Sequence, residues 1–337
     1  MSKINQIKRM MVIVNPISGT KSKKGVGIQI AKELRKLGYV VELRHTTAGG
    51  DATKWAREAA DHDYYGVVVC GGDGTVNEAA RGVRGSETAL GIIPMGSGNG
   101  LARHLQVPLN LQGALKVIAE NRVLACDYGT ANDKPFFCTF GVGYDAVVTE
   151  KFNRMPSRGL KQYIRTMLDE FPTYKGEEYK ILVNGHVLTD KALLIAVCNA
   201  SQYGNNAYIA PEASIKDGLL DVTIIHTGNA INRALAGLDV LVGLIGKTTK
   251  STTIRTREVT IIRKKGGPVH LDGEPDTMLE RIDVACHPRQ LRLFSTARKS
   301  HYRALLSPKI PILSPIVLTT LDLLYKIGDA FTPRRRK

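Results

Sequence analysis

The chain has 337 residues, few aromatic side chains and no CxxC pair, and these shortages exclude classes of function. Aromatic residues make up 6% of the sequence, with one Trp, which is poor material for the base-stacking platforms of nucleic-acid-binding proteins. The five cysteines are scattered, so the sequence indicates a reducing, cytoplasmic compartment and no zinc site. There is no run of about 20 uncharged apolar residues and no signal peptide pattern, so we expect no membrane-spanning helix.

The net charge of the chain is strongly positive, at +16. This excess favours an anionic partner, and the low aromatic content makes phosphate compounds or an anionic membrane surface better candidates than nucleic acid. Residues 289–337 hold eleven Lys or Arg and two Asp. A predicted amphipathic helix from Ser314 and the basic run 334–337 are typical of a peripheral anchor at the inner face of the membrane. A helix docked on the protein, followed by a basic end, is an equally good interpretation.

The first third of the sequence alternates between the periods of strands and helices. Short apolar runs predict strands at Met10–Val14, Val40–Arg44, Gly66–Cys70 and Ala89–Pro94. Apolar residues at helical spacing predict helices at Val26–Leu37, Ala52–Ala60, Val76–Val83 and Gly98–Leu105. This alternation is typical of a doubly wound α/β domain with a parallel sheet, in which ligands bind at the carboxyl ends of the strands.

After about residue 122, short runs rich in β-branched and aromatic residues predict a mainly antiparallel β domain. The predicted strands are Val123–Thr130, Phe136–Val142, Tyr179–Val183, Ala192–Cys198, Leu220–Ile225, Glu258–Arg263, Pro268–Leu271 and Arg281–Cys286. Two helices are predicted among them, at Leu160–Phe171 and Asn232–Ile245. We therefore expect an α/β domain at 1–125, a β domain at 126–288 and a basic tail at 289–337. Whether the start of the tail returns to the first domain is left open.

The loop after the third predicted strand is the most informative feature of the chain. Its glycines Gly71, Gly72 and Gly74 leave backbone N–H groups open to an anion, and the dipole of the following helix adds positive charge. Asp73 fits inside such a cradle if a cation bridges its carboxylate to a phosphate. Thr75 is suited to donate to a phosphate. Asn77 and Glu78 are candidates to contact a ribose or to orient their neighbours.

Two other loops leave strand ends in the same domain. The loop after the first strand has small hydroxyl residues, one glycine and three lysines, which suits a nucleotide phosphate and fits an ordinary capped turn equally well. The loop after the fourth strand is rich in Gly and Ser and opens another helix, so the loops together can enclose one nucleotide. The candidate nucleotide-binding residues in these two loops are Asn15, Pro16, Ser18, Gly19, Thr20, Gly96, Ser97, Gly98 and Asn99.

Six motifs occur in the order that is characteristic of one enzyme family. They are Asn15-Pro16 with Gly19, Thr46 with Gly50-Asp51-Ala52, the run Gly71–Glu78, Pro94 with Gly96–Asn99, the run Asp217–Asp221, and Asp272–Pro275. On these residues the chain resembles the diacylglycerol kinase catalytic-domain family, which includes sphingosine and ceramide kinases and, more distantly, NAD kinases. The resemblance adds Thr46 to the nucleotide-binding candidates. It implies an α/β domain like that of NAD kinases, a β-sandwich domain, bound ATP and Mg²⁺, and transfer of the γ-phosphate to a lipid hydroxyl.

The same resemblance implies a general base in the run that begins at Asp272. Asp272 and Glu274 are both candidates, and the sequence leaves the choice between them open. Taken alone, this run would be a surface hairpin turn. His270, two residues earlier, is a candidate to orient the base, although a structural role is the ordinary interpretation of each histidine in this chain.

The implied metal-binding residues fall into two groups. Asp73 is expected to position ATP-bound Mg²⁺ through water. A structural Mg²⁺ loop is implied at Asp217, with the backbone carbonyls of Ser214 and Leu219, although an ordinary Asp-Gly turn is a competing interpretation. Asp127 resembles a family aspartate that supports the active-site network.

The expected reaction is ATP-dependent phosphorylation of a membrane lipid, either diacylglycerol or a sphingoid base. Gly100 stands where bacterial diacylglycerol kinases usually carry an aspartate, which moves the expectation modestly towards a sphingoid acceptor. An NAD kinase-like enzyme for small molecules, or a nucleotide-binding regulator without activity, is the alternative. A homodimer is also left open.

Overall fold

The computed structural model describes residues 8–18, 25–155, 160–171, 173–228 and 250–296. These residues form two compact units, which are considered separately. Among the described residues, unit 1 consists of 8–18, 25–138, 214–219 and 286–296. Unit 2 consists of 139–155, 160–171, 173–213, 220–228 and 250–285. Gly19, Thr20, the predicted helix at Asn232–Ile245 and the tail from residue 297 lie outside the described residues.

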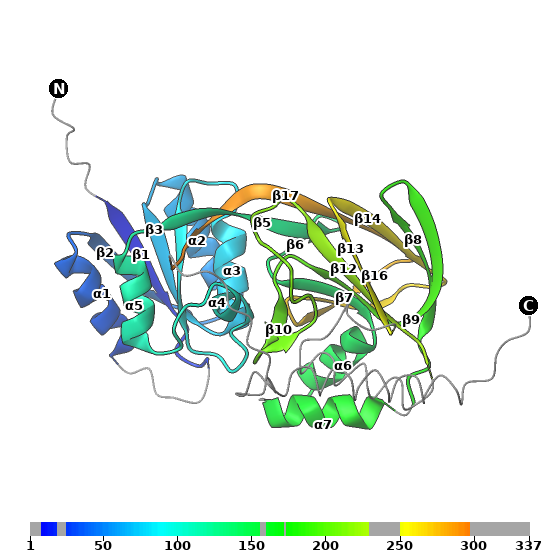
Figure 1. The fold of residues 1–337 in the computed structure, drawn as a ribbon. Helices are drawn as coiled ribbons and strands as arrows, with labels where there is room; N and C mark the ends of the chain where they lie inside the picture. The colour runs from blue at the N-terminus through cyan, green and yellow to red at the C-terminus, as the bar shows by residue number, and fades with distance from the viewer. Residues whose placement is uncertain (1–7, 19–24, 156–159, 172, 229–249, 297–337) are drawn as a thin grey trace, which may run out of the picture. The chain divides into compact units, whose positions relative to one another are not determined.

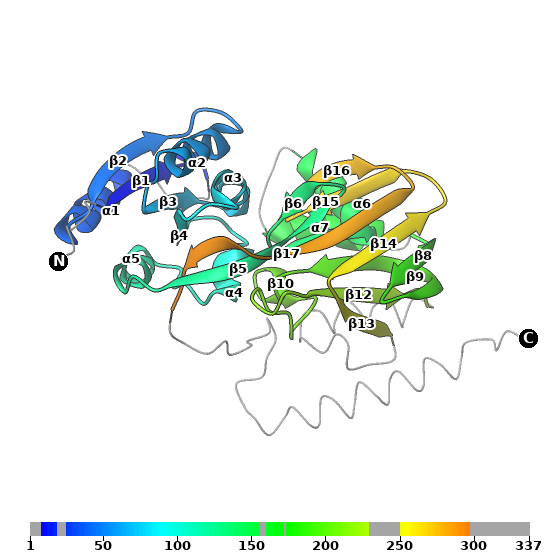
Figure 2. The ribbon, with the colours of Figure 1, turned by 90° about the horizontal axis from the view of Figure 1, so that it is seen from above.

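Unit 1 is built on a parallel sheet with the strand order β2-β1-β3-β4 (Figure 1). Its strands are β1 (Arg9–Val14), β2 (Val40–His45), β3 (Gly66–Gly71) and β4 (Ala89–Pro94), and its helices are α1 (Val26–Lys36), α2 (Asp51–Asp61), α3 (Asp73–Val83), α4 (Gly100–His104) and α5 (Leu111–Ala119). In Figure 2, α1 and α5 lie on one face of the sheet and α2 and α3 on the other. Every residue of β3 and β4 is buried, as a sheet covered on both faces requires. The predicted doubly wound α/β fold is confirmed.

Helix α3 begins at Asp73, three residues before its predicted start at Val76. Gly72 precedes the helix in an extended conformation, and Asp73 places a negative charge in the first turn, where the helix dipole favours it. Gly74 and Thr75 therefore belong to the helix and not to a loop. Helix α5 was not predicted, and α4 is shorter than the predicted helix Gly98–Leu105.

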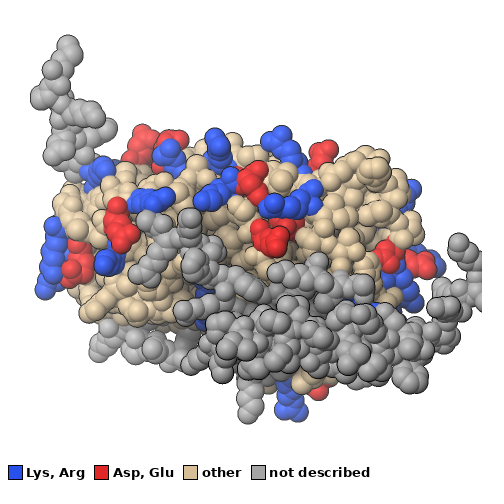
Figure 3. Space-filling view, viewed as in Figure 1, with Lys and Arg blue, Asp and Glu red and all other residues tan. Residues whose placement is uncertain are grey.

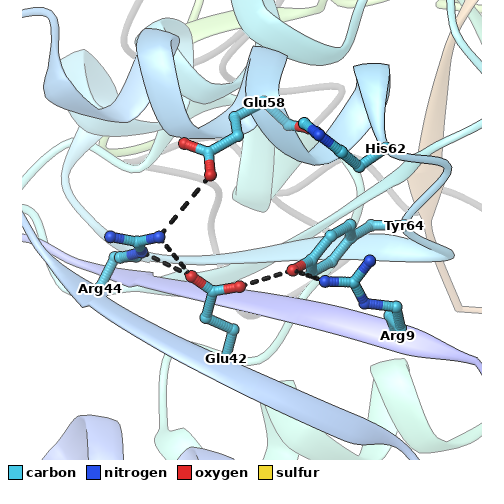
Figure 4. Close-up of polar contacts among 6 residues, drawn as sticks. All are labelled: Arg9, Glu42, Arg44, Glu58, His62 and Tyr64. Atoms are coloured by element: carbon cyan, nitrogen blue, oxygen red, sulfur yellow. Dashed lines mark hydrogen bonds and ion pairs between the residues drawn. The ribbon is translucent and has the colours of Figure 1, made fainter.

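A polar network holds the edge strand β2 in unit 1 (Figure 4). The Tyr64 hydroxyl donates to Glu42 Oε2 (2.5 Å) and accepts from Arg9 on β1 (2.5 Å). Arg44 donates to the other oxygen of Glu42 (2.7 Å) and lies 3.6 Å from Glu58 on α2. The hydrogen bond from Tyr64, with a smaller contribution from Arg44, lowers the pKa of Glu42. The network thus joins β1, β2 and α2.

Unit 2 is mainly antiparallel, as predicted. Its strands are β7 (Thr139–Gly143), β8 (Glu177–Val183), β9 (His186–Cys198), β10 (Gln202–Gly204), β11 (Ala207–Tyr208), β12 (Leu220–His226), β13 (Ser251–Thr256), β14 (Glu258–Arg263), β15 (Gly267–Leu271) and β16 (Glu274–Met278), and its helices are α6 (Tyr144–Asn153) and α7 (Leu160–Glu170). The first half of β9 pairs with β8, and its second half pairs with both β7 and β12. On the other edge of β7, β15 pairs with it and also forms a hairpin with β16.

Two predictions about the β region were wrong. The predicted strand Phe136–Val142 is two strands, because β6 (Lys134–Phe136) pairs with β5 (Val123–Ala131) in unit 1, whereas β7 pairs within unit 2. Strand β17 (Arg281–Phe294) is longer than the predicted Arg281–Cys286, and its second half belongs to unit 1. In the described part of the chain, no helix is both long enough and apolar enough to cross a membrane.

Candidate active site

In unit 1, the loop after β1 is tied to the start of α3. The Asn15 backbone N–H donates to Cys70 O (3.0 Å), and its side-chain Nδ2 donates to Thr75 Oγ1 (2.9 Å). A Cβ at position 71 would lie 2.6 Å from Thr75 Cβ, so this close approach requires Gly71. Within the first loop, Ser18 Oγ donates to the Asn15 carbonyl (3.3 Å), and Pro16 is exposed.

The loop after β4 also packs closely against the loop after β3. The Met95 N–H donates to Gly71 O (2.8 Å). A Cβ at Gly96 would lie 2.6 Å from Gly72 Cα, and a Cβ at Gly98 would lie 2.7 Å from Asp73 Oδ2. The predicted glycines are therefore required by close contact between two loops at the carboxyl end of the sheet. Ser97 is exposed at the same edge.

Asp73 joins these two loops through its carboxylate. Oδ2 accepts the backbone N–H of Asn99 (2.8 Å), and Oδ1 accepts that of Gly100 (2.7 Å). Asn99 is 7% exposed, has a φ of 52°, and exchanges two hydrogen bonds with the backbone of Gly96. The Asp73 carboxylate thus holds the loop after β4 directly by two hydrogen bonds, in addition to any contact that it makes with a cation. An outer-sphere contact with Mg²⁺ is compatible with this geometry, because carboxylate oxygens can accept more than one hydrogen bond.

The other predicted residues of unit 1 lie around these loops. Glu78 Oε2 accepts the N–H of Ala52 (3.2 Å), so this side chain faces the start of α2. Asp51 is the first residue of the same helix, and its hydrogen bonds from the Thr47 and Ala48 N–H groups in the preceding loop lower its pKa. The N–H of Thr46 donates to Val14 O (2.9 Å), which places Thr46 at the end of β2, on the same edge of the sheet. Asn77 and Gly74 lie in α3, where Asn77 is buried.

The predicted magnesium loop in unit 1 is held by Asp127. This residue is 1% exposed on β5, and its carboxylate accepts the backbone N–H groups of Gly218 (2.7 Å) and Arg289 (2.8 Å). Asp217 is exposed, and its Oδ1 accepts the N–H of Leu219 (3.1 Å). The implied ligands are one carboxylate and two carbonyl oxygens, which suit a hard cation such as Mg²⁺. The buried Asp127 carboxylate thus stabilises the backbone of this loop by its hydrogen bond from Gly218.

The predicted base lies on the β15–β16 hairpin of unit 2. Asp272 and Gly273 form its two-residue turn, with φ values of 54° and 82°, as tight hairpin turns require. The Asp272 N–H donates to Thr139 O (2.8 Å), and the Thr139 N–H donates to Asp272 Oδ1 (2.9 Å). Glu274 is exposed at the start of β16. The Asp272 carboxylate therefore stabilises the turn, which leaves Glu274 as the better candidate for the base.

The search for motifs missed several residues that organise this hairpin and its surroundings. They are Thr139, Asp145, Tyr203 and Arg263. None lies in a glycine-rich or otherwise recognisable run except Asp145, which follows Gly141-Val142-Gly143. The hydrogen-bond partners of Thr139, Asp145 and Tyr203 lie far away in the sequence, so only the tertiary structure reveals these residues.

Two family models match successive parts of the chain. Residues 9–131 match the model of the diacylglycerol kinase catalytic domain, and residues 138–295 match that of the YegS C-terminal NAD kinase beta sandwich-like domain. A "Probable lipid kinase YegS-like" of Pectobacterium atrosepticum is 30% identical over 268 residues, which covers 76% of this chain and 88% of that protein. The chain belongs to the diacylglycerol kinase catalytic-domain family, in its YegS-like bacterial branch.

Two further relatives show the range of similarity. A "Diacylglycerol kinase" of Bacillus subtilis is 29% identical over 231 residues, covering 66% of this chain and 75% of that protein. A crystal structure described as a diacylglycerol kinase from Bacillus anthracis superimposes with a TM-score of 0.70 at 22% identity, covering 87% of this chain and 98% of that one. The structural likeness establishes the fold.

Proposed function

We propose that this protein is a lipid kinase that transfers the γ-phosphate of ATP to a hydroxyl group of a membrane lipid. The observation that carries the proposal is the joined set of strand-end loops in unit 1. Asn15, Thr75, Asp73 and Asn99 connect three glycine-rich loops at one edge of a parallel sheet, where nucleotide phosphates bind in such folds. Membership of the diacylglycerol kinase catalytic-domain family supports the same function.

In the proposed reaction, backbone N–H groups of Gly72, Ser97 and Gly98 hold the phosphates. The Glu274 carboxylate accepts the proton of the lipid hydroxyl as its oxygen bonds to the γ-phosphorus, and the bond to the bridging oxygen of ADP breaks. The loop around Asp217 would hold a structural Mg²⁺, and Asp73 would hold the Mg²⁺ that is bound to ATP. The cation would neutralise charge on the phosphates.

The acceptor is proposed to be diacylglycerol or a sphingoid base. The name of the Bacillus subtilis relative favours the first. Gly100 modestly favours the second, because it stands where bacterial diacylglycerol kinases usually carry an aspartate. An anionic membrane surface, a place at the inner face of the membrane and a homodimer remain part of the proposal. On the face drawn in Figure 3, the described Lys and Arg residues are interspersed with Asp and Glu.

A panel of acceptors tests the proposal. Purified protein, labelled ATP and Mg²⁺ are incubated with mixed vesicles containing diacylglycerol, sphinganine, ceramide or undecaprenol, and with NAD⁺ in solution. We expect label in one lipid and none in NAD⁺. Label in NAD⁺ alone would support the NAD kinase-like alternative, and nucleotide binding without label in any acceptor would support the regulator.

A further inference from the structure

A buried polar cluster in unit 2 joins three elements that are distant in the sequence. His270 on β15 is 1% exposed, and Asp145 in the first turn of α6 is 6% exposed. Asp145 Oδ2 lies 3.1 Å from His270 Nε2 and accepts the hydroxyl of Tyr203 on β10 (2.8 Å). Asp145 Oδ1 accepts the N–H of Ala146 (2.8 Å). One carboxylate oxygen thus holds β15, α6 and β10 together.

The neighbouring strand leaves room for this contact by having no side chain at one position. Gly141 on β7 is paired with His270 in the sheet register. A Cβ at position 141 would lie less than 3.0 Å from both His270 Nε2 and Asp145 Oδ2. Any larger residue would therefore force the two side chains apart.

The protonation of the cluster follows from its donors. Burial, followed by the charge of Asp145, raises the pKa of Tyr203 well above its ordinary value, so its hydroxyl remains a donor. The same two causes raise the pKa of Tyr163 on α7 to about 12. His270 Nε2 must carry hydrogen to donate to Asp145, and within the described residues His270 Nδ1 has no partner.

The register of the hairpin fixes the face of Glu274 relative to that of His270. The hairpin register pairs His270 with Pro275, and Leu271 with Glu274. Residues paired across an antiparallel ladder share a face, and alternate residues of a strand face opposite sides. Glu274 therefore lies on the opposite face from His270, and a slip of one residue would exchange the two faces.

Other side-chain contacts hold the two ends of the hairpin, and the backbone of its middle pairs with β7. At the turn, Asp272 and Thr139 exchange the two hydrogen bonds described above. At the open end, the buried Arg263 donates to the carbonyl oxygens of Gly267 (2.6 Å) and Met278 (2.7 Å). His270 lies between these points, where β15 meets α6.

We propose that His270 is a positioning residue for Glu274. Its bond to Asp145 holds β15 against α6 and keeps the hairpin in the register that directs Glu274 away from the helix. This inference rests on the proposed function, because positioning Glu274 affects turnover only if the chain is a kinase. The positioning itself is independent of activity and is therefore measurable on its own.

The experiment compares wild type with His270→Leu and His270→Gln by hydrogen–deuterium exchange and by kinetics. Leucine removes the donor, and we expect exchange in peptides covering 267–278 to accelerate about tenfold or more. In the kinase assay we expect kcat to fall roughly 10- to 100-fold, because small displacements of a reacting group have effects of that size. The KM for ATP should not change, because the nucleotide loops lie in unit 1. Glutamine places an amide N–H near the position of Nε2, so exchange and kcat should return towards wild type.

A second His–Asp pair provides a matched control. His226 Nδ1 lies 2.5 Å from Asp190 Oδ2 in the same unit, and both side chains are partly exposed. His226→Leu should leave kcat and exchange at 267–278 unchanged. If His270→Leu does not fold, Tyr203→Phe, which removes one donor to Asp145 with little change of shape, should give a smaller acceleration at 267–278.

The possible failures can be told apart. Exchange at 267–278 that is as slow in His270→Leu as in wild type would overturn the positioning role. A uniform acceleration of exchange over the whole of unit 2 would overturn it too. So would a His270→Gln variant with the same exchange and kcat as His270→Leu. If wild type labels no acceptor while exchange at 267–278 still responds as expected, the proposed function fails and the positioning role stands.

Discussion

Replacing Asp73 by asparagine distinguishes a carboxylate that acts only through a cation from one that also holds two loops together. In the structure, the Asp73 oxygens accept the N–H groups of Asn99 and Gly100 at 2.8 and 2.7 Å. An asparagine retains one acceptor oxygen and turns an NH₂ group towards the other N–H. The variant therefore loses one hydrogen bond to a charged group, worth about 1.5–3 kcal/mol.

That loss should appear in nucleotide affinity. If nucleotide binding must restore the loop arrangement that Asp73 maintains in wild type, 1.5–3 kcal/mol corresponds to roughly 10- to 100-fold weaker binding. The assay is calorimetric titration of wild type and Asp73→Asn with ADP, once with Mg²⁺ and once with EDTA. We expect weaker binding by the variant in both buffers. Equal affinities in EDTA, with a difference only in Mg²⁺, would refute the loop-holding role and leave cation positioning alone.

Two further variants test parts of the fold. Gly141→Ala introduces a Cβ between His270 and Asp145, so we expect about 1–3 kcal/mol of destabilisation, measured as a lower thermal midpoint; an unchanged midpoint would contradict the packing described. The hydrogen bond from Tyr64 is the largest cause that lowers the folded-state pKa of Glu42 below its ordinary value of 4.5. The ionised carboxylate therefore stabilises the fold at pH values above 4.5, and this stabilisation is lost as the pH falls through the folded-state pKa. Glu42→Gln should therefore be less stable than wild type at neutral pH, and the difference in midpoint should shrink in acid; a constant difference would contradict this assignment.

The parallel sheet and its loops could be predicted because local patterns determine them. Strands and helices in unit 1 have different hydrophobic periods, and glycine-rich loops follow three of the strands. The sequence also indicated that Asp73 lies at the edge where these loops meet. It did not indicate that the Asp73 oxygens accept backbone N–H groups from residues 26 and 27 positions later, because that contact depends on the loop conformation around Asn99.

The hairpin of unit 2 that includes Glu274 was harder to predict for a physical reason. The start of β16, Glu-Pro-Asp-Thr, lacks the β-branched and aromatic run that marks a strand, and it forms a strand by pairing with β15. The choice between Asp272 and Glu274 became possible only when Thr139 was found bonded to Asp272. The glycines before Asp145 did not indicate its partners, because His270 and Tyr203 lie 125 and 58 residues away.

Phosphate transfer by a Glu274→Gln variant tests the proposed function most directly. Wild type, Glu274→Gln and the control Asp276→Asn, which changes a carboxylate on the same strand, are given labelled ATP and the acceptor lipid found with the panel. ATP affinity is measured for all three. We predict that Glu274→Gln binds ATP like wild type and labels the lipid about 100-fold more slowly or worse, whereas Asp276→Asn retains wild-type turnover. Labelling by Glu274→Gln within a few-fold of wild type would contradict the assignment of Glu274 as the base.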